Sequence, residues 1–325
     1  MTNFPNGVAC FGQAVLPAIL QAPHSGRVYW VSNNSTTPGN DVKVGQDQAH
    51  PAGGTYNRPF ATIDYAVGQC RSAQGDVIIV KEGHAETLTP TSLALDVAGV
   101  KIVGLGTGPQ RPGLTFDTAT DTITVSAAGV EMHNFRFIAA IGDVVAAVTA
   151  TTATDLVLSD ILMQESSTFQ FINMVAATGA ANTADRMTIR RVQWHSDDAG
   201  SDGLVIATGS MDSLLIEDCS VMFDAGVAAG VALALAADQQ ATNLIVRRNS
   251  FKTALVDTAG IIVAGTAATS SGVIYENYIQ ALDAAAAGFT GAATVPIMLG
   301  NNWYTGAAAE PLAIATVGGT IYNNA

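Results

Sequence analysis

The acidic side chains best placed for chemistry lie in one short segment, His195 to Gly203, which reads HSDDAGSDG. It contains Asp197, Asp198 and Asp202, and Asp224 follows further along the chain. Glycoside hydrolysis needs two carboxyl groups, one as the acid and one as the base or nucleophile. Asp, Ser and Gly are also the residues that build solvated turns. We therefore interpret the segment first as a turn, and keep these four aspartates as the candidate catalytic set.

Two arginine pairs, Arg190-Arg191 and Arg247-Arg248, recur at matching positions. They could bind an anionic glycan, or form salt bridges with a neighbouring subunit. In the simpler interpretation, which we favour, one arginine of each pair binds a carboxylate of the same chain, such as Glu217.

We expect no metal ion and no cofactor. His84 has no second His or Cys at metal-ligand spacing. The Gly-rich run 104–108 lacks the Lys-Ser/Thr pair of a phosphate-binding P-loop. Cys10, Cys70 and Cys219 are widely separated and odd in number, which indicates free thiols and synthesis in a reducing cytoplasm.

The charge balance argues against two classes of partner. The formal net charge is −13, with only 14 Lys and Arg residues, so clustered cations for a phosphate backbone are lacking. The same acidity argues against anionic membrane surfaces. The longest nearly uncharged apolar stretch, 225–237, is too short to span a bilayer. Residues 1–5 show no secretion signal. We therefore predict no nucleic-acid and no membrane partner.

A short pattern recurs from Val100 onwards: apolar, any residue, apolar, then a turn residue. Its copies start roughly 24 to 31 residues apart, a period typical of solenoids. A second series of β-branched runs lies between the copies, and no segment there has a helical apolar period, which excludes a βαβ fold. The pattern predicts an all-β, single-stranded, right-handed parallel β-helix. The expected inward stack is Ile102, Met132, Leu158, Ile189, Ile216, Val246, Tyr275 and Leu299. The expected corner residues are Asn134, Asp160, Asp218, Asn277 and Asn301, with Arg191 and Arg248 at the same corner.

The first part of the chain differs from the repeats. We predict an extended N-terminal arm over residues 1–55 and a β-helix domain over 56–325. The arm would pack on the rod or on a partner, and its candidate contact residues are Phe4, Phe11, Val15 and Leu16. Residues 58–70 predict a capping helix, in which Phe60, Ile63 and Val67 share one face and cover the open end of the solenoid.

The cap block, Arg58 to Val67 followed by Gly75 to Val80 and Gly83, resembles the entry of pectate-lyase-like right-handed β-helices. With the opening residues 6–12 and the strand Val28 to Ser32, the chain is similar to β-helix proteins of tailed-bacteriophage virions. The resemblance implies a virion protein, made in the host cytoplasm and commonly trimeric. Such proteins decorate or cement the capsid, or serve as tailspikes.

We therefore expect a non-enzymatic structural protein that decorates a phage head as a homotrimer, with the major capsid protein or other virion proteins as partners. The alternative is a tailspike-like polysaccharide depolymerase or lyase. The aspartate segment superficially resembles that of polygalacturonases, but the Gly-His-Gly and Arg-x-Lys elements of that family are absent. A groove lined by carboxylates from adjacent coils would favour the enzyme, and a flat Ala/Thr-rich side face would favour assembly.

Overall fold

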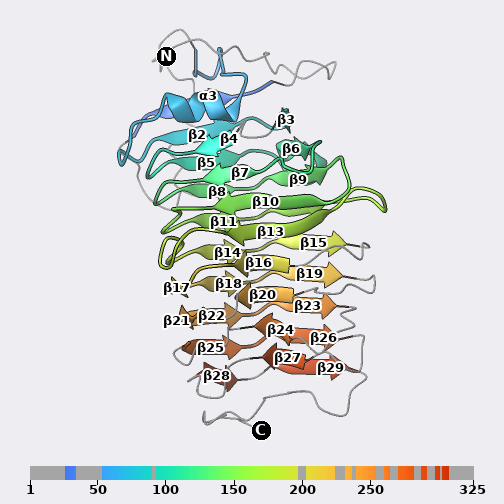
Figure 1. Ribbon diagram of the computed structural model, residues 1–325. Helices are drawn as coiled ribbons and strands as arrows, with labels where there is room; N and C mark the ends of the chain where they lie inside the picture. Colours follow the sequence, from blue (N-terminus) through green and yellow to red (C-terminus); the bar gives the residue numbers. More distant parts are fainter. Residues whose placement is uncertain are drawn as a thin grey trace, which may run out of the picture.

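The chain folds into a parallel β-solenoid, in which each coil adds one short strand to each of three sheets (Figure 1). The computed structural model describes residues 26–33, 53–89, 93–196, 203–223, 231–235, 239–253, 260–263, 270–281, 287–290, 297–300 and 302–306. All pairings between strands in the sheets are parallel, so the expected parallel β-solenoid is confirmed.

We name the sheets A, B and C in the order in which the chain visits them. Sheet A contains β1 (Val28–Val31), β2 (Val77–Val80), β5 (Lys101–Gly104), β8 (Glu131–His133), β11 (Val157–Ser159), β14 (Thr188–Arg190), β18 (Leu215–Glu217), β22 (Leu244–Arg247), β25 (Gly272–Tyr275) and β28 (Ile297–Gly300). Sheet B contains β3 (Ala85–Leu88), β6 (Gly113–Phe116), β9 (Arg136–Ala139), β12 (Leu162–Gln164), β15 (Gln193–Ser196), β19 (Ser220–Phe223), β23 (Ser250–Thr253), β26 (Tyr278–Ala281) and β29 (Trp303–Gly306).

Sheet C contains β4 (Leu93–Leu95), β7 (Ile123–Val125), β10 (Val144–Ala150), β13 (Phe171–Ala177), β16 (Gly203–Ala207), β20 (Val231–Leu235), β24 (Gly260–Val263) and β27 (Ala287–Thr290). The short strands β17 (Met211–Asp212) and β21 (Ala241–Thr242) pair with each other at the corner before sheet A, and η1 (Gly108–Gln110) is a single 3-10 turn.

The core is a column of apolar side chains that stack from coil to coil. The predicted inward residues of sheet A from Ile102 to Val246 are buried and lie in register with one another. The prediction that Tyr275 points inward was wrong. Ile274 is the buried residue, and it lies in register with Val246 and Leu299. The repeat in fact starts at Gly272, which pairs with Leu244. A shift of one residue moves every side chain of a strand to the other face.

The corner between sheets A and B has left-handed backbone geometry, as predicted. Asn134, Asp160, Arg191, Asp218 and Arg248 have φ between 52° and 65°. The same shift of register applies on the next coil, where Glu276, and not Asn277, has φ 56°. Asn301 lies outside the described residues.

Helix α3 (Ile63–Gly68) is shorter than the predicted helix over residues 58–70. Thr62 is the N-cap residue, and its side chain accepts a hydrogen bond from the Tyr65 backbone amide. Phe60 lies before the helix, in a parallel bridge with Val31, because its backbone pairs with β1. Phe60, Ile63 and Val67 are all buried in the main core. The helix contacts β1, β2 and β4 at one end of the stack (Figure 1).

Candidate functional site

A ladder of polar side chains runs along the outer face of sheet A and its corner with sheet B. The register pairs successive outward residues His133, Ser159, Arg190, Glu217, Arg247 and Tyr275. The corner residues beside them are Asn134, Asp160, Arg191, Asp218, Arg248 and Glu276. We call this set, with Lys101 and Glu131, the polar ladder.

The first part of the polar ladder brings together the residue types of a serine hydrolase. His133 Nδ1 lies 2.5 Å from Ser159 Oγ, and His133 Nε2 lies 2.9 Å from Glu131 Oε2. Lys101 Nζ is 2.8 Å from the same Glu131 oxygen. Burial raises the pKa of Glu131, but hydrogen bonds from His133 and Lys101 outweigh it and hold that pKa below its ordinary value.

This arrangement does not present a nucleophile. Ser159 is fully buried, and its hydroxyl lies 2.9 Å from Asp160 Oδ2, to which it donates. A substrate carbonyl must reach the oxygen that attacks it, so acyl transfer is not supported by this geometry. His133 was not among the candidate residues drawn from the sequence. The available signal was the alternation Glu131-x-His133 on one outer face, with a serine at the matching position of the next coil.

The second part of the polar ladder is a network of ion pairs between coils. Arg247 and Arg248 both bind Glu217 Oε2 at 2.9 Å, which confirms the predicted pairing. Arg248 also binds Asp218, and Arg247 donates to the Tyr275 hydroxyl at 3.0 Å. Hydrogen bonds from Arg248 hold the pKa of Asp218 below its ordinary range.

Arg191 binds a different carboxylate from the one suggested by sequence. Its Nε and Nη2 donate to the two oxygens of Asp160, both at 2.7 Å, on the preceding coil. Arg186 reaches back in the same way to Asp155. Arg190 lies in register between Ser159 and Glu217, and its Nε is buried without a hydrogen-bond partner. Paired arginines and carboxylates therefore connect neighbouring coils, and in the described coils they leave no row of free carboxylates along this face.

The outer face of sheet C is chemically different. Its central outward column is uncharged and consists of small or β-branched residues in register: Ala94, Thr124, Thr149, Ala176, Ile206 and Ala234. Strands β10 and β13 are longer than the neighbouring strands of this sheet. Val145 in β10 is 53% exposed, and Phe169, just before β13, is 41% exposed. The described part of this column therefore has the Ala/Thr-rich composition expected of an assembly face.

The predicted candidate residues themselves lie outside the described residues: Asp197, Asp198, Asp202 and Asp224, and the arm residues Phe4, Phe11, Val15 and Leu16. β15 of sheet B ends at Ser196, and β16 of sheet C begins at Gly203. A catalytic role for the four aspartates stays a prediction.

His84 is buried and structurally engaged. Its Nδ1 accepts a hydrogen bond from the Asn33 backbone amide, so the other ring nitrogen, Nε2, is the one that donates to Glu86 Oε2, at 3.0 Å. The same carboxylate oxygen accepts from the Ile63 amide at the start of α3. In the part of the chain that the structure describes, no three His, Cys, Asp or Glu residues are grouped closely enough to hold a metal ion.

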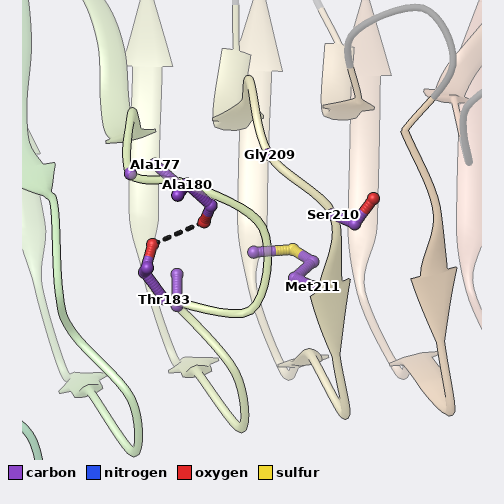
Figure 2. A pocket seen from close by; sticks show the side chains of 8 residues that line it. Ala177, Ala180, Thr183, Gly209, Ser210 and Met211 are labelled. Carbon is purple, nitrogen blue, oxygen red and sulfur yellow. Dashed lines mark hydrogen bonds between the residues drawn. The ribbon is translucent and has the colours of Figure 1, made fainter.

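A small hollow lies between the connections that follow β13 and β16 (Figure 2). It is lined by Ala177, Gly179, Ala180, Thr183, Ala184, Gly209, Ser210 and Met211. Figure 2 shows the Thr183 hydroxyl donating to the Ala180 carbonyl, at 2.7 Å. The hollow has no interior space for a water molecule, so it offers no enclosed volume in which a ligand could be buried.

No protein-family model, curated protein or solved structure matches the chain. Within the described ranges, no helix is long and apolar enough to cross a membrane.

Proposed function

We propose that this chain is a structural virion protein, a capsid decoration or cement protein that stabilises or decorates the head of a tailed phage as a homotrimer. The observation that carries the proposal is the uncharged outer face of sheet C, with Val145 and Phe169 exposed beside it. Its other partners would be the major capsid protein or other virion proteins, and the chain would be made in the host cytoplasm.

Electrostatics favours sheet C as the contact face between copies. Each copy carries a net charge of −13, so two copies repel one another through most of their surface. The outward column from Ala94 to Ala234 has no charged side chain, so burying it avoids the large desolvation cost of an ionised group. The interface cores of oligomers are likewise depleted in charged residues.

The phage context comes from the sequence resemblance of the cap block, residues 6–12 and the strand Val28 to Ser32. We propose with it that the coil is right-handed, since parallel crossover connections almost always have that hand. Helix α3 would then be the N-terminal cap, because its buried residues Ile63, Ala66 and Val67 pack on the first strands. Burial raises the pKa of the Cys70 and Cys219 thiols to about 12, which keeps them protonated and suits a protein assembled in a reducing compartment.

The oligomeric state of the purified chain tests the assembly role. We expect a trimer by light scattering coupled to size-exclusion chromatography. The double substitution Val145→Asp and Ile206→Asp adds like charges to the sheet C face and should give monomers. Gln193→Asp, on the exposed face of sheet B, is the matched control and should remain trimeric. A monomeric parent protein, or an unaffected double variant, would overturn the proposed interface.

A virion experiment tests the location. Mass spectrometry of purified particles from the phage that encodes the chain should find it at fixed stoichiometry to the major capsid protein. Reconstruction of those particles should place it on the head. Its absence from the particles would refute the proposal.

An activity assay distinguishes the structural role from the alternative, a polysaccharide depolymerase or lyase. The parent chain and a variant with Asp197, Asp198, Asp202 and Asp224 all replaced by Asn are incubated with acidic polysaccharides. We expect no release of reducing ends or unsaturated uronates from either. Release by the parent chain that the quadruple variant has lost would establish an enzyme instead.

A further inference from the structure

His84 and His133 make the same contact with a nearby glutamate. Nε2 of His84 lies 3.0 Å from Glu86 Oε2, and Nε2 of His133 lies 2.9 Å from Glu131 Oε2. The two rings differ in what faces their second nitrogen, Nδ1. A neutral imidazole has one donor and one acceptor nitrogen, whereas a charged imidazole has two donors. The partner of Nδ1 therefore determines which charge state satisfies the contacts of each ring.

His84 is satisfied as a neutral ring. Its Nδ1 faces the Asn33 backbone amide at 3.1 Å, and an amide N–H can only donate. Nδ1 must therefore accept, so the single proton of the ring is on Nε2, where it binds Glu86. The ring is fully buried, so a second proton would deprive the Asn33 amide of its partner without water to replace it.

His133 is satisfied as a charged ring. Its Nδ1 lies 2.5 Å from Ser159 Oγ, and the same oxygen lies 2.9 Å from Asp160 Oδ2. An ionised Asp160 can only accept, so Ser159 donates its one proton to Asp160 and accepts from Nδ1, while Nε2 donates to Glu131. These three contacts need three protons. The charged ring and the hydroxyl supply all three, whereas a neutral ring leaves one contact without a proton.

Both carboxylates are held in the ionised form. Burial raises the pKa of Glu131 and the pKa of Asp160, and hydrogen bonds oppose burial in each case. His133 and Lys101 donate to Glu131, and Arg191 donates to Asp160, so both pKa values lie below their ordinary values. Neither carboxyl group therefore supplies a proton to these contacts near neutral pH.

The charges around the ring do not explain a charge on His133. The charged groups of the neighbouring strands and corners are Lys101, Arg111, Glu131, Asp160, Arg190 and Arg191. Four of them are cations, which oppose a further positive charge. The contacts of the two ring nitrogens are therefore what favours the proton.

We propose that His133 is the proton-dependent member of the polar ladder. With its ring charged, it donates to Glu131 on its own strand and to Ser159 on the next coil, and Ser159 donates to Asp160. When the ring loses its proton, the Ser159 hydroxyl turns to Nδ1 and the hydrogen bond to Asp160 is lost. The junction between β8 and β11 is therefore strongest in mild acid, and the charged ring cannot act as a base for Ser159.

The two histidines should give stability pH dependences of opposite sign. Folding favours the proton on His133, so the folded protein binds it more tightly than the unfolded chain does. An unfolded histidine titrates at about pH 6.5, so the stabilisation by His133 is complete well below that pH and is lost as the pH rises above it. Folding disfavours a second proton on His84, so the contribution of His84 is lost as the pH falls.

Nitrogen NMR of the histidine rings tests the charge states. The full-length protein is produced with isotope-labelled histidine, and His84→Gln and His133→Gln identify the two sets of signals. At about pH 6.5, where an ordinary histidine is half charged, we expect His133 to show two protonated nitrogens and His84 to show a proton on Nε2 alone. A neutral or half-charged pattern for His133 would overturn the proposal.

A second variant separates the hydrogen bonds from the local charge. Ser159→Ala removes the acceptor of Nδ1 and leaves every charged group in place, so His133 should change to a half-charged or neutral pattern at the same pH. Ser250→Ala, at an exposed position further along the rod, is the matched control and should leave the His133 signals unchanged. Unchanged His133 signals in Ser159→Ala would show that these contacts do not hold the proton.

Urea unfolding at about pH 6 and about pH 8 tests the effect on the rod, because an unfolded histidine passes from mostly charged to mostly neutral between them. The loss of stability in His133→Gln should be larger at the lower pH, and the loss in His84→Gln should be larger at the higher pH. A loss for His133→Gln that is equal at both values, or larger at the higher one, would contradict a proton-dependent junction. The assembly role is tested separately, so the two proposals fail independently.

Discussion

The side-chain amide of Asn249 donates a hydrogen bond of 2.9 Å to Oδ1 of Asn277, one coil further along the rod. Asn277 repeats the contact, donating to Oδ1 of Asn302 at 2.9 Å and to the Val246 carbonyl at 2.9 Å. Both Asn249 and Asn277 are buried at the corner between sheets A and B. This row of asparagines, which we call the asparagine ladder, therefore supplies hydrogen-bond partners for backbone groups that the turn leaves unpaired.

Asn277→Ala should destabilise the protein by about 2–3 kcal/mol, because it leaves the backbone amide of Asn249 buried without its partner and removes the side-chain hydrogen bonds to Asn249 and to the Val246 carbonyl. Urea unfolding followed by circular dichroism measures the change. Ser250→Ala, on the exposed neighbour of Asn249, is the control and should stay close to the parent protein. Equal urea midpoints for the two variants would show that the asparagine ladder does not contribute to stability.

Replacing Ile274 should cost far more than replacing its neighbour Tyr275. Ile274 is 1% exposed, so Ile274→Ala creates a cavity and should cost about 3 kcal/mol. Tyr275 faces outward, and Tyr275→Phe loses only the hydrogen bond from Arg247, so it should cost less than about 1 kcal/mol. Urea unfolding of the two variants gives the two losses of stability. A larger loss for Tyr275→Phe than for Ile274→Ala would instead support the register predicted from the sequence, with Tyr275 inward.

Asp76 should make the free energy of unfolding decrease as the solution becomes acidic. Burial opposes its ionisation, but hydrogen bonds from the Arg71 side chain and from the Arg27 and Arg71 amides outweigh burial and lower its pKa. A carboxyl whose pKa is lowered on folding stabilises the native state above its unfolded pKa of about 3.9, and loses that contribution as the pH falls through the folded value. Asp76→Asn should therefore cost stability at neutral pH, and the difference from the parent should shrink below about pH 4.

Unfolding midpoints at neutral and acid pH check the Asp76 prediction, with Asp117→Asn at an exposed position as the control. A difference between Asp76→Asn and the parent that is the same at every pH would contradict it.

Ser159 should not react as a catalytic serine, although His133 and Glu131 lie beside it. A fluorophosphonate probe, which modifies activated serines, should leave the peptide containing Ser159 unmodified, because the hydroxyl is buried and donates to Asp160. Mass spectrometry of the labelled, digested protein gives the result. An adduct on Ser159 that disappears in His133→Ala would instead reveal a working hydrolase.

The sequence by itself determined the solenoid, its core and most of its corners. The reason is that these features are local: alternation places Ile102, Met132 and Leu158 on one face, and left-handed geometry selects Asn134 and Asp160. A strand that pairs only with neighbouring coils needs little more than its own pattern. The prediction failed at Tyr275 and Asn277, because the copy at Gly272 begins with a residue that has no apolar side chain to mark the start of the strand.

Only the tertiary structure decided which side chains meet. Glu131 and His133 are close in sequence, but Ser159 joins them only because β8 and β11 pair in one register. Arg191 binds Asp160 on the preceding coil because the arginine side chain crosses one strand spacing to reach it. The outward apolar cluster on β1, β2 and β5 is likewise invisible in sequence, since Trp30, Ile79 and Val103 look like ordinary strand residues until the sheet shows that they face away from the core. Contacts between coils depend on the register of the strands and on the direction of each side chain, and the local sequence pattern determines neither.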